Sequence, residues 1–286
     1  MTDRMVVVTG VSSGIGRATA VMLAARGFHV FGSVRRAEHA ASLAKQLGDR
    51  FTALLFDVTD AAAIDAARTV VAKRLGDRTL AALVNSAGIA LAGPLLYQDE
   101  AEFAQHLAVN VTGPFLVTRA FASLLGTDRS RSGEPGRIVM VSSISGGLAT
   151  PFLGAYAASK HALEAYADTL RRELMPFGVD VVIVGPGAVA TPIWDKGEAA
   201  GSDAYAATPY VEAFAGFQRW IVANGRKGLP PAVVAATIAE AITARSPRAR
   251  YAVLRGKFAG WTVPRLLPRR MLDRMLAKRT GLSPRG

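Results

Sequence analysis

"RMVVVTGVSSGIGRATA", residues 4–20, decides the expected fold. A short valine run reads as a buried strand, and an alanine-rich helical segment follows it. Gly10, Gly14 and Gly16 lie at the junction, where glycine permits a tight turn and a close approach of the backbone to a pyrophosphate. The N-terminus of the following helix adds free N–H groups and a positive dipole end. Any loop that needs positive φ could use such glycines, so a dinucleotide site is indicated by the context of a strand before and a helix after.

The rest of the chain repeats this alternation of short apolar runs and longer alanine-rich segments. Strands that are apolar throughout are typical of burial on both faces, and strand–helix alternation predicts a parallel sheet with crossover helices. The sequence therefore predicts a single-domain, Rossmann-like, doubly wound α/β fold of about seven strands, with ligands beyond the carboxyl ends of the strands. Strands are expected at "RMVVVTG", "HVFGSV", "FTALLFDV", "ALVNSAG", "RIVMVSS", "DVVIVGPG" and "RYAVLRG", and helices near 15–26, 38–47, 61–76, 100–126, 155–177 and 231–245.

Two motifs carry a resemblance to a known family. "TGVSSGIG" (9–16) is similar to the Thr-Gly-x-x-x-Gly-Ile-Gly motif of the short-chain dehydrogenase/reductase family at every fixed position, and "GAYAASK" (154–160) contains its Tyr-x-x-x-Lys pair. The resemblance extends over residues 4–192. It implies a nicotinamide-dependent oxidoreductase, acting as a homodimer or homotetramer joined through the helices around 100–126 and 155–177.

The second predicted strand indicates which nicotinamide dinucleotide is bound. An NAD-preferring site usually ends this strand with an acid, whereas "HVFGSVRR" has Val34 there, followed by Arg35 and Arg36. Two guanidiniums could hold a 2′-phosphate through bidentate, charge-assisted bonds, although a basic pair is more often a solvated surface feature. The missing acid favours NADP(H) over NAD(H).

The family resemblance assigns further residues to the cofactor. Asp57 matches an aspartate that contacts the adenine ring, "NSAG" (85–88) replaces the usual Asn-Asn-Ala-Gly, and "VGPGAVATPI" (184–193) turns the chain over the nicotinamide. The full set of cofactor residues expected in this way is Gly10, Ser12, Ser13, Gly14, Ile15, Gly16, Arg35, Arg36, Asp57, Val58, Asn85, Ala87, Gly88, Tyr156, Lys160, Pro186, Gly187, Val189 and Thr191.

Four residues are expected to form the reacting centre. A free tyrosine, with a pKa near 10, exchanges protons poorly at neutral pH, but an ammonium one helical turn away stabilises tyrosinate. Tyr156 beside Lys160 can then act as general acid in reduction and general base in oxidation. The resemblance selects Ser143, thirteen residues before the tyrosine, to hold the substrate oxygen. It also selects Asn110 to support the lysine, and a structural role for this helical asparagine can coexist with that support.

Two C-terminal regions leave alternatives open. Residues 193–228, the expected substrate lid, contain Trp194, Tyr205, Tyr210, Phe214, Phe217 and Trp220, which either line a pocket for a bulky apolar substrate or pack the lid onto the body. Residues 244–286, expected to hold the last strand and a basic extension beyond a domain of residues 1–243, carry 12 Lys/Arg and one acid. A helix from Pro268 to Gly281 would carry Leu267, Met271, Leu272, Met275 and Leu276 on one side and Arg269, Arg270, Arg274, Lys278 and Arg279 around the rest. It either contacts an anionic membrane or, the favoured alternative, packs on the protein with a solvated basic face.

Composition narrows the function further. The chain has no cysteine, which excludes disulfides and thiolate chemistry, and four scattered histidines argue against a metal centre. No uninterrupted apolar run reaches the roughly 18 residues of a membrane span, so a cytoplasmic location is expected, and no nucleic-acid recognition motif accompanies the basic tail. The expected function is the interconversion of a secondary alcohol and a ketone, with a steroid-, retinol- or lipid-like substrate. The alternatives are a catalytically silent dinucleotide-binding regulatory or scaffold protein, or a reductase of small polar carbonyls.

Overall fold

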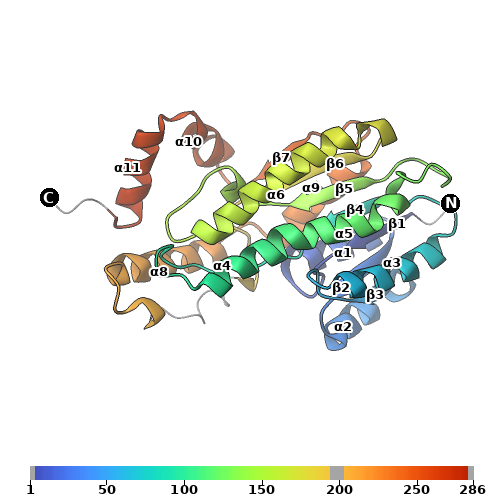
Figure 1. Cartoon of the computed structure of the whole chain (residues 1–286), viewed down its shortest axis with the longest axis horizontal. Helices are drawn as coiled ribbons and strands as arrows, with labels where there is room; N and C mark the ends of the chain where they lie inside the picture. The colour runs from blue at the N-terminus through green and yellow to red at the C-terminus, as the bar shows by residue number, and fades with distance from the viewer. Residues whose placement is uncertain (1–3, 194–202, 283–286) are drawn as a thin grey trace.

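The fold is a seven-stranded parallel sheet, seen in a computed structural model that describes residues 4–193 and 203–282 (Figure 1). The strand order is β3-β2-β1-β4-β5-β6-β7, which confirms the predicted doubly wound topology. The order reverses between β1 and β4, and ligands of such sheets bind beyond the carboxyl ends of the strands at this switch point. The strands are β1 Met5–Val8, β2 His29–Val34, β3 Phe51–Leu55, β4 Ala82–Asn85, β5 Arg137–Val141, β6 Asp180–Pro186 and β7 Arg250–Val253.

Helices follow the predicted ranges closely, with one change of type. The segment expected as one helix over 100–126 is divided, because a π-helical stretch, Ala108–Thr112, separates α4 from α5 and a 3₁₀ turn, Ala122–Leu125, ends it. The helices are α1 Gly14–Ala25, α2 Ala37–Leu47, α3 Ala61–Leu75, α4 Glu100–Leu107, α5 Gly113–Phe121, α6 Gly154–Glu173, α8 Val211–Arg226, α9 Pro231–Thr243, α10 Val263–Leu266 and α11 Arg269–Arg279.

Helices cover both faces of the sheet, as the apolar strands require. In β1 the side chain of Val7 faces one layer of core, which α3, α5 and α6 complete with residues such as Val71, Phe121 and Leu163. Its neighbours Val6 and Val8 face the other layer, which α1, α2 and α9 complete. Successive side chains of a strand therefore point alternately into the two core layers. Figure 1 shows α3, α5 and α6 together on one face of the sheet.

The helical stretch Glu100–Leu125 is long and apolar enough in mean hydropathy to cross a membrane by length and composition alone. In the fold it lies along the sheet, where Val117, Phe121, Leu124 and Leu125 are fully buried in the core shared with α3 and α6. These four buried side chains account for part of its apolar character.

The lid and the C-terminal extension lie beside the carboxyl edge of the sheet. Phe214 and Phe217 of α8 pack with Tyr205 and Phe152 in a separate aromatic cluster, which we call the lid cluster. The extension ends in α11, whose bounds match the helix expected between Pro268 and Gly281. Its C-terminal end packs on α8, because the Arg279 guanidinium lies 4.7 Å from the Trp220 ring centre and Leu282 joins the lid cluster.

Candidate active site

The glycine loop has the shape that a pyrophosphate needs. Gly10 and Gly14 have φ values of +71° and +56°, which other residues adopt rarely, and α1 begins at Gly14. A Cβ at Gly16 would collide with the Gly10 carbonyl oxygen, and a Cβ at Gly10 would lie 2.9 Å from the Ala87 Cα. Ile15 is half-buried against the core, whereas Ser12 and Ser13 are exposed beside the bare backbone. This loop fits the phosphates of a dinucleotide at a helix N-terminus.

The carboxyl end of β2 holds the expected basic pair. Val34, in the position where an acid would select NAD, is buried, while Arg35 and Arg36 project with side chains 69% and 66% exposed. Arg35 Nη1 lies 3.8 Å from Asp57 Oδ2, so these two expected cofactor residues are neighbours. Asp57 Oδ1 accepts bonds from the backbone and hydroxyl of Thr59, which fixes its orientation.

The loop after β4 is tied to the glycine loop. Thr9 Oγ1 accepts bonds from the backbone N–H groups of Ser86 and Ala87, at 2.9 and 3.0 Å. Asn85 turns its side chain inward, since its amide donates to Thr118 Oγ1 at 3.1 Å. A Cβ at Gly88 would lie 3.1 Å from Asn110 Oδ1 and 3.7 Å from Lys160 Nζ. Bare backbone at Gly88 therefore borders two of the expected catalytic residues.

Asn110 lies in the π-helical stretch between α4 and α5 and is fully buried. Its Oδ1 accepts from Ile89 N at 2.9 Å, and its Nδ2 donates to Ile89 O at 2.9 Å and to Ser159 Oγ at 3.0 Å. Single-turn π segments are frequent at functional sites, because the extra residue displaces a side chain from its helical position. Here the Asn110 amide bonds both backbone groups of Ile89, the residue that follows the "NSAG" segment.

The side chains of Ser143 and Tyr156 lie next to each other in the site. Ser143 follows β5 and is buried, and its Oγ also accepts from Ser145 N at 3.0 Å, which fixes the side chain. Tyr156 lies in the first turn of α6. Burial raises the pKa of the Tyr156 phenol, and the neighbouring Ser143 hydroxyl acts in the opposite direction by stabilising the phenolate. A proton donor and a hydroxyl that can share one substrate oxygen are therefore adjacent.

Lys160 lies one helical turn beyond Tyr156 and is almost completely buried. Its Nζ donates to Val141 O at 3.0 Å and lies 5.8 Å from the Tyr156 ring centre. Burial lowers the pKa of Lys160 to about 8, against the opposing effect of the Glu164 carboxylate. A charged ammonium at this place, next to the phenol, would favour the ionised form of that phenol.

The segment after β6 returns over the glycine loop. Pro186 ends β6, Gly187 N donates to Val253 O at 2.9 Å, and Val189 is buried where it pairs with Leu229. Thr191 reaches Gly14, at which a Cβ would lie 3.2 Å from its methyl group. Val58, the remaining member of the expected cofactor set, is buried and packs beside Gly113. Tyr156 and Lys160 lie on α6, and the other expected cofactor residues lie at the carboxyl ends of β1, β2, β3, β4 and β6, on the loops that follow these strands, or in the first turn of α1.

The aromatic residues of the lid mostly pack on one another. Tyr205, Phe214 and Phe217 are buried with Phe152, and Tyr210 lies edge-on to Phe152 at 6.1 Å. Trp194 lies outside the described residues. Phe152 has φ +66°, the left-handed region in which a bulky residue is strained, four positions before Tyr156. The packing interpretation therefore accounts for these buried rings.

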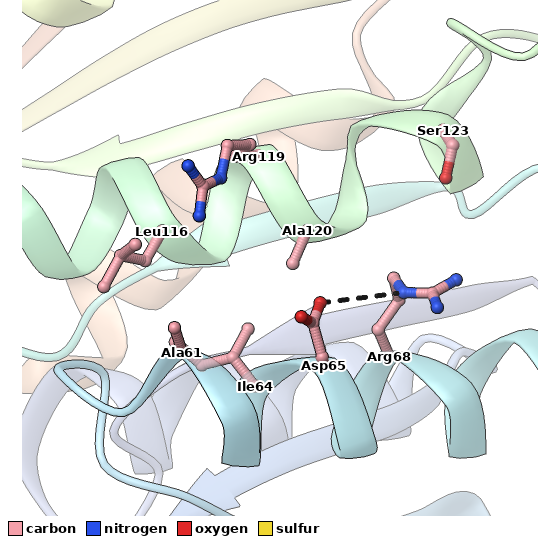
Figure 2. A pocket seen from close by; sticks show the side chains of 8 residues that line it. All are labelled: Ala61, Ile64, Asp65, Arg68, Leu116, Arg119, Ala120 and Ser123. Atoms are coloured by element: carbon pink, nitrogen blue, oxygen red, sulfur yellow. Dashed lines mark ion pairs between the residues drawn. The ribbon is translucent and has the colours of Figure 1, made fainter.

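A cavity of about 230 Å³ lies elsewhere, between α3 and α5 (Figure 2). Asp65 and Arg68 of α3 form a 4.0 Å ion pair at its wall, and Leu116 and Arg119 of α5 face them. No residue of the expected site lines this cavity.

Sequence reasoning missed a second group behind the serine. Glu164, one turn beyond Lys160, forms a 2.6 Å ion pair with Arg250 of β7, and Ser142 Oγ donates to the same carboxylate. The spacing of Glu164 from Lys160 puts both on one face of α6 and could have singled it out. Its partner lies 86 residues away, so the sequence has no local signal for the pair.

A switch-point glycine loop and a Ser–Tyr–Lys–Asn cluster at the same edge of the sheet define a nicotinamide-dinucleotide oxidoreductase. A family model described as short chain dehydrogenase matches residues 4–200. The chain is 40% identical over 275 residues to the NADPH-dependent 3-dehydrocapnine reductase of Ornithobacterium rhinotracheale, covering 96% of each chain. It is 34% identical to mouse retinol dehydrogenase 5, covering 96% of this chain and 88% of that one.

A solved structure agrees with these sequence relatives. A short-chain dehydrogenase from Streptomyces avermitilis superposes with a TM-score of 0.79 at 28% identity, covering 98% of both chains. The chain belongs to the short-chain dehydrogenase family, and it is an NAD(P)-dependent oxidoreductase that acts on CH–OH groups.

Proposed function

We propose that the protein interconverts a secondary alcohol and a ketone, with NADP(H) as its preferred cofactor and a bulky apolar substrate. The observation that carries the proposal is the Ser143 hydroxyl beside the Tyr156 phenol, with Lys160 one turn away and Asn110 next to Lys160 across Gly88. A nicotinamide cofactor supplies or accepts the hydride when it is bound.

The residues of the chain would handle the proton and the substrate oxygen. Ser143 Oγ binds the substrate oxygen, and the Tyr156 hydroxyl donates its proton to that oxygen in the direction of reduction. Lys160 stabilises the phenolate that results, and the Asn110 side chain holds the loop at Gly88 that borders Lys160. This complete set argues against the catalytically silent alternative.

The preference for NADP(H) is supported by Arg35 and Arg36, which project from the end of β2 where Val34 replaces an acid. The relative from Ornithobacterium is described as NADPH-dependent. Replacing both arginines by alanine should weaken NADPH binding at least tenfold, since hydrogen bonds to charged groups contribute about 1.5–3 kcal/mol each. NADH binding should change less than threefold, and equal losses for both cofactors would contradict the assignment.

An apolar substrate is supported by the loop beside α6. Leu95, Leu96 and Tyr97 are 56%, 83% and 47% exposed, and Leu95 reaches Gly154, two residues before Tyr156. Exposed leucines at the rim of a site favour an apolar ligand over a small polar carbonyl. Retinol dehydrogenases are among the relatives.

A series of 2-alkanones tests the reaction and the substrate class together. With NADPH oxidation followed by absorbance, kcat/KM should rise from 2-butanone to 2-dodecanone, by up to about fourfold per buried methylene because each contributes about 0.8 kcal/mol. Tyr156→Phe should abolish turnover and still bind NADPH. A kcat/KM that is flat or falls with chain length would favour the small polar carbonyls instead.

A membrane-facing role of the tail is a second proposal, which one observation favours. Met271 and Met275 of α11 and Leu266 of α10 are 57%, 43% and 78% exposed among the arginines of the extension. Charge and exposed apolar side chains together suit an anionic bilayer surface. The variant Arg269→Glu/Arg270→Glu/Arg274→Glu should lose binding to phosphatidylglycerol vesicles, with phosphatidylcholine vesicles as the control. Failure of the intact protein to bind either vesicle would leave α11 as a solvated basic helix.

We also propose a homodimer or homotetramer formed through α4, α5 and α6. Phe103 and Phe115 are 36% and 41% exposed on this surface, and Phe115 lies edge-on to Tyr166 of α6 at 6.2 Å. Light scattering after size exclusion should give a multimer for the wild type and a smaller species for Phe103→Glu/Phe115→Glu. A monomeric wild type would remove this proposal.

A further inference from the structure

A largely buried ion pair lies next to the segment that carries the candidate catalytic Ser143. Glu164 is on α6 and Arg250 begins β7, and their side chains are 15% and 20% exposed. Arg250 Nη2 lies 2.6 Å from Glu164 Oε1, and Arg250 Nε lies 3.0 Å from Glu164 Oε2. This bidentate arrangement fixes the two planar groups relative to each other, and so it joins α6 to the far edge of the sheet.

Both partners of the pair also bind the two serines that follow β5. Ser142 Oγ donates to Glu164 Oε1 at 2.8 Å, and Arg250 Nη2 donates to the backbone oxygen of Ser143 at 3.2 Å. The side chain of one serine and the carbonyl of the next are thus held by a single ion pair. Gly146 leaves room for it, since a Cβ there would collide with Glu164 Oε1.

The Trp261 ring packs against the Arg250 guanidinium of the ion pair. The Arg250 guanidinium carbon lies 4.1 Å from the Trp261 ring centre, and Trp261 is 7% exposed. Within the described chain Arg250 Nη1 has no hydrogen-bond acceptor, so the ring face is its contact. A Cβ at Gly147 would lie 2.6 Å from the same ring. The C-terminal extension therefore reaches the segment that carries Ser143, although the family match ends at residue 200.

We propose that Glu164 and Arg250 are positioning residues, whose ion pair, backed by Trp261, holds the Ser142–Ser143 segment so that the Ser143 hydroxyl faces Tyr156. The proposal rests on the alcohol–ketone reaction proposed above. A buried ion pair contributes little net stability, because desolvation of the two charges offsets their attraction. Its value here lies in orientation, since two of its hydrogen bonds end on the serines of the reacting centre. Glu164 additionally favours the charged form of Lys160.

Glu164→Gln tests the proposal, with Glu173→Gln, an exposed site on the same helix, as the matched control. The most active 2-alkanone and NADPH serve as substrates. We expect kcat to fall at least tenfold, the Kd of NADPH to stay within twofold, and the primary isotope effect with C4-deuterated NADPH to increase. Gly146→Ala should do the same, because it displaces the Glu164 carboxylate without removing a charge.

Hydrogen exchange gives a readout that needs no turnover. Gly146 N donates to the Ser143 carbonyl that Arg250 also binds, so amide exchange in residues 142–147 should accelerate in both variants and not in the control. A kcat within threefold of wild type in both variants would overturn the proposal. If the wild type reduces no 2-alkanone, the proposed function fails separately, and unchanged exchange in 142–147 would still overturn the positioning role. Trp261→Phe, read by the same exchange, replaces Glu164→Gln if that variant does not fold.

Discussion

Replacing Asn110 by leucine tests how far this residue holds the site together. The side chain is fully buried and forms both an acceptor and a donor bond with the backbone of Ile89, each 2.9 Å long. Leucine is similar in size but leaves the Ile89 N–H and C=O unpaired in the interior. Each unsatisfied buried group costs about 1–3 kcal/mol, so the free energy of unfolding should fall by about 2–6 kcal/mol. That is a large part of the roughly 5–15 kcal/mol that stabilises a typical domain.

Urea unfolding followed by circular dichroism measures this loss. Ser159→Ala is the matched control, because it removes the third partner of the Asn110 amide and leaves the Ile89 bonds intact. The control should lose about 1–3 kcal/mol, as expected for two hydrogen bonds, because Ser159 Oγ also donates to Tyr156 O at 2.7 Å. A loss below 1 kcal/mol in Asn110→Leu, with an unchanged denaturant slope, would show that Asn110 does not hold the loop at Ile89. Its role would then be confined to the chemistry.

Three further predictions concern titration and the glycine loop. His106 accepts a bond from Leu91 N at 3.0 Å and burial lowers its pKa, so its contribution to stability is present above about pH 6.5 and lost as the pH falls below it. Between pH 7.5 and 5.5, urea unfolding should show a steeper loss in the wild type than in His106→Gln. The pKa of Lys160 is about 8, so its charge is lost as the pH rises through this value, and kcat/KM for ketone reduction should decline there. In Lys160→Arg the decline should move to higher pH. A constant kcat/KM of the wild type from pH 7 to 9 would refute this. Gly16→Ala should weaken NADPH binding more than tenfold in a fluorescence titration, because its Cβ collides with the Gly10 carbonyl oxygen; unchanged affinity would show that the loop adapts.

The fold could be predicted from the sequence because its strands are apolar on both faces. Val6, Val7 and Val8 are all fully buried, as expected when helices cover both sides of a parallel sheet. Gly10 and Gly14 then mark the first strand-to-helix turn through their positive φ, a backbone conformation that glycine adopts without strain. Strand burial and the strand-to-helix turn each depend on residues that are close in the sequence, so both can be recognised from short sequence patterns.

The parts that could not be predicted depend on contacts between distant segments. A helical pattern over 100–126 does not reveal that the helix changes to π geometry at Asn110, because the residue that Asn110 contacts there, Ile89, lies 21 positions away in the sequence. The aromatic residues of the lid give one pattern whether they line a pocket or pack together. The contacts of these rings centre on Phe152, which lies on another segment of the chain, so the sequence has no local signal for them.

The basic residues of the C-terminal extension form two groups, which cannot be told apart from the composition of the segment. Arg250 and Arg265 lie 4.1 and 4.5 Å from the Trp261 ring centre, and Arg250 is bound to Glu164. Arg250 therefore belongs to the contacts behind Ser143, whereas Arg265 lies exposed over the Trp261 ring and Arg269 and Arg270 of α11 are exposed as well. Deleting the whole extension would therefore remove Trp261 together with the exposed charges, and lost turnover could not be separated from lost membrane contact.

Charge reversal in α11 should abolish vesicle binding and leave kcat in solution within twofold of wild type. Trp261→Phe should lower kcat and leave vesicle binding unchanged. If either variant changes both properties, the extension acts as one unit and the separation of its charges into two groups is wrong.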